Sequence, residues 1–431
     1  MVKSDHTLSG PIAYLTGEYP RATDTFIQRE VSALRTLGIE VMTCSIRKTG
    51  AEHLVGVEQL EEAKNTFYVL KAAKSPLRLI ACHLRTAVLT PYSYFSTLWL
   101  ALCTGSSGIK GRLYQLFYFA EAVILADYLK QCGVIHLHNH IAMASCSVAM
   151  LASNVSGIPF SFTLHGPDIF FEPQRWRLDA KIKKARFVAC ISNYCRDQAK
   201  GFSDPDCWGK LHIVHCGVEP DRYAVQQPPD HGSLHLTFVG RLAAVKGIPV
   251  LFEALGKLLP ENPNLRVTLI GDGPERAELE CEALALELQD VITFAGYQSQ
   301  SEVAAALRET DLFVLPSFAE GVPVVLMEAM ASGVAVIATR IAGIPELVED
   351  GVSGLLVPAG NVDALADALS TLLNDKARRI QMGQAGREKV LAEFNIKHET
   401  ARLAKILHSY ILDGEPPAKR LLNNKRIARD G

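Results

Sequence analysis

The sequence lacks several patterns that mark common functional classes. Its ten cysteines include no C-x-x-C pair, which argues against a zinc ribbon or a thioredoxin-like redox centre and favours buried, reduced thiols. No basic stripe is interleaved with aromatic side chains, so nucleic acid is not an expected partner. Residues 1–17 contain charges and a glycine where a secretory signal requires an uninterrupted apolar core. We therefore expect no secretory signal there.

Long hydrophobic runs are also absent. The longest apolar stretch, Leu116–Leu129, is interrupted by Glu121 and Asp127 and is shorter than the ~20 residues that a membrane-spanning helix needs. Such a stretch is typical of a buried or interfacial helix. The localisation that we expect is cytoplasmic, with a peripheral position on the inner face of the cytoplasmic membrane as one option.

Charge is unevenly distributed, although the formal net charge is only −2. Residues 1–200 contain 22 Lys and Arg against 15 Asp and Glu, whereas residues 201–431 contain 22 against 31. A basic half is a candidate for docking on an anionic membrane. Attraction between the two halves across a cleft would explain the same asymmetry.

Strand-like and helix-like segments alternate along most of the 431 residues, which predicts α/β layers. The first half opens with a strand at 11–17 and a helix at 26–38, as in a βαβ unit. A polar, proline-rich stretch is the best linker candidate, and the alternation restarts after it. We therefore predict two doubly wound Rossmann-like domains that face a central cleft. The predicted segments are 1–218 for the first domain, 219–233 for the linker, 234–393 for the second domain and 394–431 for a returning helix with a basic tail.

Two carboxylates flank a tight turn in the second half. The run DLFVLPS at 311–317 predicts a buried parallel strand, and VPVVLMEAMASG predicts a helix with Pro323 in its first turn. Glu320 is then expected in the loop at the strand's carboxyl end, and Glu328 inside the helix. A helix N-terminus reached through a glycine-containing loop favours anion binding. Two solvated glutamates, or a capping role for Glu320, would fit the same spacing.

Two basic residues follow the first strand of the second half. Arg241 comes directly after the segment 234–240, and Lys246 lies one loop further on. Arginine can grip a diphosphate bidentately and lysine adds a point charge, so the pair suits a leaving nucleoside diphosphate. Two solvated basic residues on a loop are the alternative interpretation.

Five motifs follow one another in the second half. They are TFVGRLAAVKG (237–247), LIGDGPER (269–276), FAGY (294–297), SFAEGVPVVLMEAMASGVAVIAT (317–339) and AGIPELVEDGVSGLLVPAG (342–360). In this order they resemble the retaining GT-B glycosyltransferases of family 4, also called glycosyl transferases group 1. The opening TGEYPRATDTFIQREVSAL (16–34), with HLHNH and LHGPDIF, is similar to the colanic acid and amylovoran type of exopolysaccharide enzymes.

The resemblance implies a nucleotide-sugar site in the second domain and an acceptor site in the first. It implies that Arg241 and Lys246 bind the diphosphate, that Glu328 accepts hydrogen bonds from the ribose, and that Glu320 faces the transferred sugar. The backbone at 321–322 would meet the phosphates. The catalytic candidates are His165, Glu320, Arg241 and Lys246. The donor-binding candidates are Gly17, Arg241, Lys246, Gly271, Gly296, Tyr297, Glu320, Gly321, Val322 and Glu328.

Four histidines of the first half lie in predicted strands or at their ends. A lone histidine at a strand end is more often structural, but the resemblance implies that His165 reaches the sugar or the reacting phosphate. Gly17 is expected in the loop after the first strand, where the usual glycine pair of the family is replaced by Thr-Gly-Glu. His136, His138 and His140 alternate along one strand and share one face. A metal cluster is conceivable there, but we expect a structural role and no metal site.

The predicted function is a retaining glycosyltransferase in exopolysaccharide or cell-surface polysaccharide biosynthesis. Its donor would be a nucleotide sugar, with a UDP-sugar favoured, and its acceptor a lipid-diphosphate-linked saccharide or an oligosaccharide. The resemblance implies no cofactor and no divalent metal, because cations of the protein carry the leaving-group charge. A sugar-nucleotide epimerase of similar two-domain shape and a non-catalytic sugar-nucleotide-binding module are the alternatives. Neither needs the basic pair and the two glutamates together.

Overall fold

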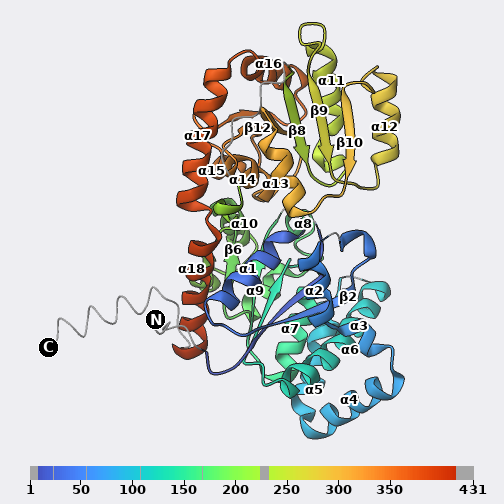
Figure 1. The fold of residues 1–431 in the computed structure, drawn as a ribbon. Coiled ribbons are helices and arrows are strands. Elements are labelled where there is room, and N and C mark those ends of the chain that lie inside the picture. The colour runs from blue at the N-terminus through green and yellow to red at the C-terminus, as the bar shows by residue number, and fades with distance from the viewer. Residues whose placement is uncertain are drawn as a thin grey trace, which may run out of the picture.

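The structure is a computed structural model that describes residues 8–22, 24–54, 56–106, 108–166, 168–223 and 233–413. In these ranges the chain forms two α/β domains, with the C-terminal domain at the top of Figure 1. Most of the expected linker (224–232) and the basic tail (414–431) lie outside the described residues.

The N-terminal domain is built on a seven-stranded parallel sheet in the order β3-β2-β1-β4-β5-β6-β7. The order reverses between β1 and β4, and doubly wound sheets bind ligands outside the carboxyl ends of the strands at such a switch point. The strands are β1 (Ile12–Tyr19), β2 (Val41–Lys48), β3 (Phe67–Tyr68), β4 (His136–His140), β5 (Phe160–Leu164), β6 (Val188–Cys190) and β7 (Leu211–Ile213).

Helices connect these strands. Both α4 and α5 begin with a proline, whose missing N–H costs nothing in a first turn. The helices are α1 (Thr25–Thr36), α2 (Val57–Asn65), α3 (Val69–Ala73), α4 (Pro76–Leu89), α5 (Pro91–Cys103), α6 (Ile109–Gln131), α7 (Ala144–Ser156), α8 (Asp168–Phe171), α9 (Leu178–Lys184) and α10 (Asn193–Gly201). None of the described helices of the chain is long and apolar enough to cross a membrane.

The C-terminal domain repeats the design with a six-stranded parallel sheet in the order β10-β9-β8-β11-β12-β13. Here the switch point lies between β8 and β11. The strands are β8 (His235–Val239), β9 (Arg266–Ile270), β10 (Ile292–Gly296), β11 (Leu312–Leu315), β12 (Ala335–Thr339) and β13 (Leu355–Val357). The helices are α11 (Ile248–Leu258), α12 (Arg276–Ala285), α13 (Gln300–Arg308), α14 (Val324–Ala331), α15 (Ile344–Leu347), α16 (Val362–Leu373), α17 (Lys376–Glu393) and α18 (Ile396–His408). The two sheets confirm the predicted fold class.

The last two helices run along the side of both domains (Figure 1). Between them the chain pairs with the end of the N-terminal domain, because Val218 exchanges backbone hydrogen bonds with Phe394 and Ile396, both 3.0 Å long. Helix α18 then packs on α1, where Leu403 and Leu407 share a buried cluster with Ile27 and Val31. Burial of four such side chains contributes about 1.5–3 kcal/mol each, so α18 holds the two domains together from the outside.

Two local predictions were wrong. Gly17 does not lie in a loop, since β1 continues to Tyr19 and Glu18 still pairs with Arg47 of β2. The second glycine that would interrupt the strand is missing from this sequence. Pro323 is the N-cap of α14 instead of a first-turn residue, because its ψ of 123° is extended and the helix starts at Val324.

Candidate functional site

The carboxyl ends of the two sheets meet where the domains touch. A Cβ atom on Gly321, in the loop between β11 and α14, would lie 2.2 Å from the carbonyl oxygen of His165, directly after β5. Only a glycine allows the two backbones to come this close. A second contact joins the same two domains. The Glu346 carboxylate of α15 accepts 2.8 Å hydrogen bonds from the backbone N–H groups of Asn193 and Tyr194. Of the predicted site residues, His165 and Gly321 therefore lie where the two domains touch.

Lys246 and Glu320 form one unit at the switch point of the C-terminal sheet. Lys246 closes a short 3-10 turn after β8, and its Nζ lies 2.6 Å from Oε1 of Glu320. The Ser317 hydroxyl donates to the same oxygen at 2.7 Å. The carboxylate is mostly buried, with 10% of the side chain exposed. Glu320 is thus neutralised and fixed, which leaves it suited to holding hydroxyl groups and poorly suited to attacking a carbon atom.

Arg241 lies in the connection after β8, at the same switch point. It follows β8 after one glycine, Gly240, and it is exposed. In the described part of the chain its guanidinium has no hydrogen-bond or ion-pair partner. An arginine with its donors available, five residues before an ion-paired lysine, is suited to binding an anion bidentately.

Backbone donors complete this edge of the sheet. Among the described residues, the N–H groups of Gly321 and Val322 have no hydrogen-bond acceptor, and the N-terminus of α14 follows directly. Free N–H groups at a helix N-terminus form a site for phosphate or carboxylate. The geometry is thus compatible with the predicted phosphate contact of this loop.

Glu328 has a partner that the sequence did not suggest. Its Oε1 is ion-paired with Nη2 of Arg29 from α1 of the other domain, and both side chains are almost fully buried. Arg29 also donates to Gln300 Oε1 at 3.1 Å and to the Tyr223 hydroxyl at 3.1 Å. Burial alone would lower the pKa of Arg29, but Glu328, together with Tyr223 and Glu219, outweighs it, so this pKa is raised above its ordinary value. The pair links the two domains at the carboxylate that we expect to bind ribose.

His165 stands at the end of a buried polar chain in the N-terminal domain. Its Nε2 lies 3.0 Å from Nδ1 of His140, whose Nε2 lies 3.1 Å from the Glu30 carboxylate. Tyr14 donates a 2.7 Å hydrogen bond to that carboxylate. Burial, followed by the neighbouring His140, holds the pKa of His165 well below its ordinary value. His165 is therefore neutral near pH 7, and Glu30 orients it through His140.

The other strand histidines are held by hydroxyl groups. His136 Nε2 lies 2.7 Å from the Ser161 hydroxyl, and the two ring nitrogens of His138 lie 2.7 and 2.9 Å from the hydroxyls of Ser161 and Thr163. Ligand atoms of Glu30, His138 and His140 do come within 4.8 Å of one another. However, both nitrogens of His138 are already engaged, which favours the structural role that we predicted; the absence of a metal stays a prediction.

The glycines near the expected base site are explained by backbone packing. A Cβ atom on Gly271 would lie 1.9 Å from the Gly240 carbonyl oxygen, and Gly271 N–H donates to the Gly296 carbonyl at 2.8 Å. These residues shape the ends of β8, β9 and β10. Tyr297 follows directly, and its ring lies 5.4 Å from that of His53 in the N-terminal domain. Beside Gly17 the space is open, since a Cβ atom there would meet nothing within 4 Å.

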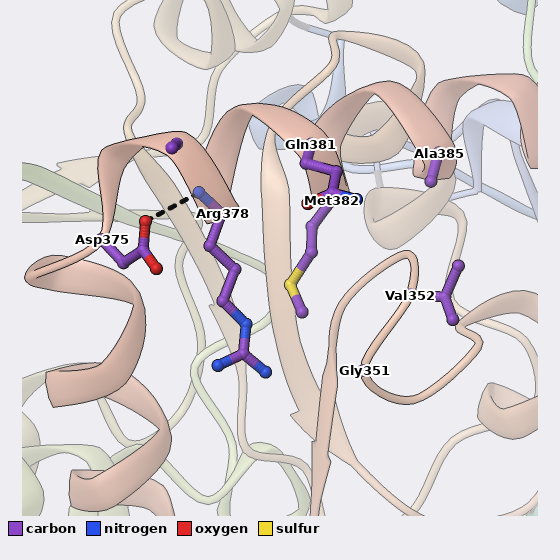
Figure 2. Close-up of a pocket in the computed structure, with 8 residues that line it drawn as sticks. Gly351, Val352, Asp375, Arg378, Gln381, Met382 and Ala385 are labelled. Carbon is purple, nitrogen blue, oxygen red and sulfur yellow. Dashed lines mark hydrogen bonds between the residues drawn. The ribbon is translucent and has the colours of Figure 1, made fainter.

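A pocket of about 410 Å³ on the C-terminal domain contains none of the predicted site residues (Figure 2). It lies between the turn at Gly351 and Val352 and the start of α17, where the Asp375 carboxylate caps the helix by accepting from Arg378 N–H at 2.9 Å. Figure 2 shows the Arg378 side chain extending away from that cap. We assign no function to this pocket.

Sequence reasoning missed the residues that act across the domains or behind His165. They are Arg29, Glu30, Tyr223, Gln300 and Glu346. The only signal in the sequence was that Arg29 and Glu30 are charged residues in the helix directly after β1, at a switch point. Arg29 is buried against residues more than 250 positions away in the other domain, and Glu30 is buried against Tyr14 and His140 of its own domain.

Comparisons with known proteins agree with this architecture. The family model described as Glycosyl transferases group 1 matches residues 221–389, and the model Glycosyltransferase Family 4 matches residues 105–222. The D-inositol 3-phosphate glycosyltransferase of Corynebacterium efficiens is 40% identical over 307 residues, which cover 63% of this chain and 70% of the relative. The chain belongs to the glycosyl transferases group 1 family.

Other relatives of this glycosyltransferase are named for exopolysaccharide synthesis. The amylovoran biosynthesis glycosyltransferase AmsK of Erwinia amylovora is 36% identical over 205 residues, which are 46% of this chain and only half of AmsK. The putative colanic acid biosynthesis glycosyltransferase WcaL of Salmonella typhimurium is 27% identical over 92% of this chain and 99% of its own length. The crystal structure of HepE from Anabaena in complex with UDP superposes with a TM-score of 0.68 over 93% of this chain and all of HepE. At 17% identity this likeness shows the GT-B fold alone.

Proposed function

We propose that this glycosyltransferase transfers a sugar, with retention of its anomeric configuration, from a UDP-sugar to a lipid-diphosphate-linked saccharide in exopolysaccharide biosynthesis. The observation that carries the proposal is the convergence, at one switch point, of Arg241, the Lys246–Glu320 unit, the free N–H groups of residues 321–322, and Glu328. This set offers cations and N–H groups to a diphosphate and carboxylates to hydroxyl groups. The names of AmsK and WcaL support the polysaccharide pathway, and the UDP bound to HepE supports the donor base.

The bond changes follow from this arrangement. The bond between the anomeric carbon and the diphosphate oxygen breaks, and charge develops on the diphosphate beside Arg241 and Lys246. The acceptor hydroxyl forms the new bond on the same face of the sugar, and its proton moves to the departing phosphate oxygen. Glu320 would hold the sugar hydroxyls, and the neutral His165 could donate or accept one hydrogen bond there. No protein nucleophile and no divalent metal take part in this proposed sequence.

We also propose where the enzyme works and which domain binds the acceptor. A lipid-diphosphate acceptor resides in a membrane, so the enzyme would work as a peripheral protein on the cytoplasmic face. The N-terminal domain would bind it, because the basic half of the chain suits a diphosphate. Nothing in the fold or in the comparisons favours an epimerase or a non-catalytic binding module.

Donor binding tests the proposal most directly. We expect UDP to bind in titration calorimetry, with weaker binding of GDP and ADP, and we expect Arg241→Ala and Glu328→Ala each to weaken it at least tenfold. Lys376→Ala, an exposed lysine on α17 outside the site, serves as the matched control. Equal affinity of the wild type and both site variants would overturn the donor site. NMR of the purified glycoside product reports the anomeric configuration of the new bond, and a configuration opposite to that of the donor would overturn retention.

A further inference from the structure

Three neighbouring helices of the N-terminal domain carry large apolar side chains on their solvent faces. On α4 and α5 the exposed residues recur every three or four positions, so each helix presents one apolar stripe to solvent. The stripes consist of Leu77, Ile80, Leu84 and Val88 on α4, Tyr92, Phe95, Trp99 and Leu102 on α5, and Ile109, Leu113 and Phe117 at the start of α6. Several are more than two-thirds exposed, including Leu77 at 82% and Trp99 at 69%. Single exposed apolar residues are ordinary, but aligned stripes on adjacent helices mark an interaction surface.

Contacts on the inner faces of these helices keep the apolar stripes on the solvent side. The Tyr94 hydroxyl of α5 lies 2.9 Å from Nδ1 of His83 on α4, and the Tyr94 ring packs 5.1 Å from that of Phe119 on α6. Arg85 of α4 is ion-paired with the buried Asp127 of α6. The helices therefore already use their inner faces, and rotation to bury the stripes would break these contacts.

The charge within this segment of the chain is of one sign. Residues 63–120 contain no Asp or Glu, and they contain seven Lys and Arg residues. All seven are exposed: Lys64, Lys71, Lys74, Arg78, Arg85, Lys110 and Arg112. The field at this surface is therefore positive, although Arg85 is compensated by Asp127.

The position of these helices suits a flat partner. Helices α4 and α5 lie at the end of the N-terminal domain that is remote from the C-terminal domain, at the bottom of Figure 1. The C-terminal domain thus leaves this end uncovered. An apolar surface that includes aromatic residues and carries basic residues nearby has the chemistry of an interfacial membrane anchor.

We propose that α4, α5 and the first three turns of α6, here called the docking surface, lie on the surface of an anionic lipid bilayer. The stripes would enter the boundary between headgroups and acyl chains, and the lysines and arginines would face anionic headgroups. A second copy of the chain fits this surface less well, because a two-fold interface would bring the basic residues of both copies together. The proposal rests on the proposed function only in that a lipid-linked acceptor gives the docking its purpose.

Vesicle binding tests the docking surface without any acceptor or donor. We expect the wild type to cosediment with phosphatidylcholine vesicles that contain 30 mol% phosphatidylglycerol, and to bind pure phosphatidylcholine much more weakly. Each basic residue near an anionic surface strengthens binding about fivefold, so Lys71→Glu, Lys74→Glu and Lys110→Glu together should weaken it at least 100-fold. The matched control makes the same charge change at the exposed lysines Lys183, Lys376 and Lys405, and it should retain most of the binding.

Apolar variants separate insertion from charge attraction alone. Leu84→Ser, Phe95→Ser and Trp99→Ser, combined, keep every lysine and should still lose at least tenfold in vesicle binding. In a Trp176→Phe and Trp208→Phe background Trp99 is the only tryptophan of the chain. Its emission should then shift to the blue with anionic vesicles and be quenched by brominated lipid. Equal binding of the wild type and both triple variants, or an unquenched Trp99, would overturn the proposal.

Two controls separate this result from the fate of the proposed function. UDP affinity, measured without vesicles, should be unchanged in the lysine and apolar variants, since the docking surface lies outside the donor site. Loss of vesicle binding with normal UDP binding supports docking, whereas vesicle binding without any UDP binding would refute only the donor assignment. Sedimentation velocity tests whether a second copy of the chain covers the docking surface instead. A wild-type dimer that the apolar variant converts to monomer would show a self-interface and overturn the bilayer proposal.

Discussion

The ion pair between Arg29 and Glu328 predicts that one substitution will disturb two properties of the enzyme. Both side chains are buried, with 3% and 7% exposed, and the other partners of Arg29 are the neutral groups of Gln300 and Tyr223. In Glu328→Leu the guanidinium would remain buried without a counter-charge. Removing one partner of a buried pair costs about 3–5 kcal/mol. Because the partners come from different domains, separation of the domains can hydrate Arg29 and relieve this cost.

We therefore expect Glu328→Leu to shift the protein from domain contact toward domain separation by roughly 100- to 4,000-fold, since ~1.4 kcal/mol corresponds to a factor of ten. Fluorescence energy transfer between one label on each domain measures this shift. The variant should also lose UDP affinity, because charge-assisted hydrogen bonds to ribose hydroxyls contribute about 1.5–3 kcal/mol each.

The double variant Arg29→Leu/Glu328→Leu separates the two effects. Replacing both members of a buried pair by apolar residues is often neutral for stability, so the domain contact should return. UDP affinity should not return, because no carboxylate is left for the ribose. Glu346→Ala is the matched control: it breaks a different contact between the domains and should leave UDP affinity nearly unchanged. Unchanged energy transfer in Glu328→Leu, or recovery of UDP binding in the double variant, would refute this reasoning.

Three other predictions concern the charged groups of the site. Arg241→Lys should lower kcat at least tenfold with little change in stability, because a bidentate phosphate contact becomes a point charge. Steady-state kinetics and thermal unfolding measure the two effects, and a loss of kcat that only parallels a loss of stability would contradict this prediction. The single variant Lys246→Met should lose more unfolding free energy than the double variant Glu320→Gln/Lys246→Met, because the single variant leaves the Glu320 carboxylate unpaired. Additive losses of unfolding free energy in urea would argue against the Lys246–Glu320 unit. Unfolding free energy should fall below about pH 6.5, because burial lowers the pKa of several histidines that must be neutral in the fold and become charged on unfolding. Each can contribute up to about 1.4 kcal/mol at pH 5.5, and a flat profile in urea titrations between pH 7.5 and 5.5 would count against it. The histidines are His136, His138, His165 and His212.

Patterns that depend on local periodicity were predictable from the sequence. The strand–helix alternation predicted both sheets, and the turn at Gly321 predicted a carboxylate in the loop after β11 and another in α14. These features depend on short-range rules, namely buried apolar runs for parallel strands and glycine or proline at helix ends. The same rules misplaced Gly17, because strand length is set by the partner: Glu18 and Tyr19 pair with β2 and extend β1 beyond its apolar run.

Contacts between the domains were not predictable. The isolated sequence of α1 shows Arg29 and Glu30 as two polar residues on an amphipathic helix, which normally face solvent. They are buried because α13, α14 and β4 supply Gln300, Glu328 and His140 as partners. Such a match is a property of the folded surfaces, and one sequence without its relatives carries no sign of it.

The partners of the two glutamates bear on how the bond is broken. Glycosidases that retain configuration use a carboxylate as nucleophile, about 5 Å from a second carboxyl group. Here Glu320 Oε1 is held by both Lys246 and Ser317, and Glu328 Oε1 is held by Arg29. Attack by either carboxylate would require it to leave a cation in a largely buried site, at a cost of several kcal/mol on top of the chemical barrier. In the proposed mechanism the cations would stabilise the departing diphosphate only if they stay in place, which favours a direct displacement in which that diphosphate takes the acceptor proton.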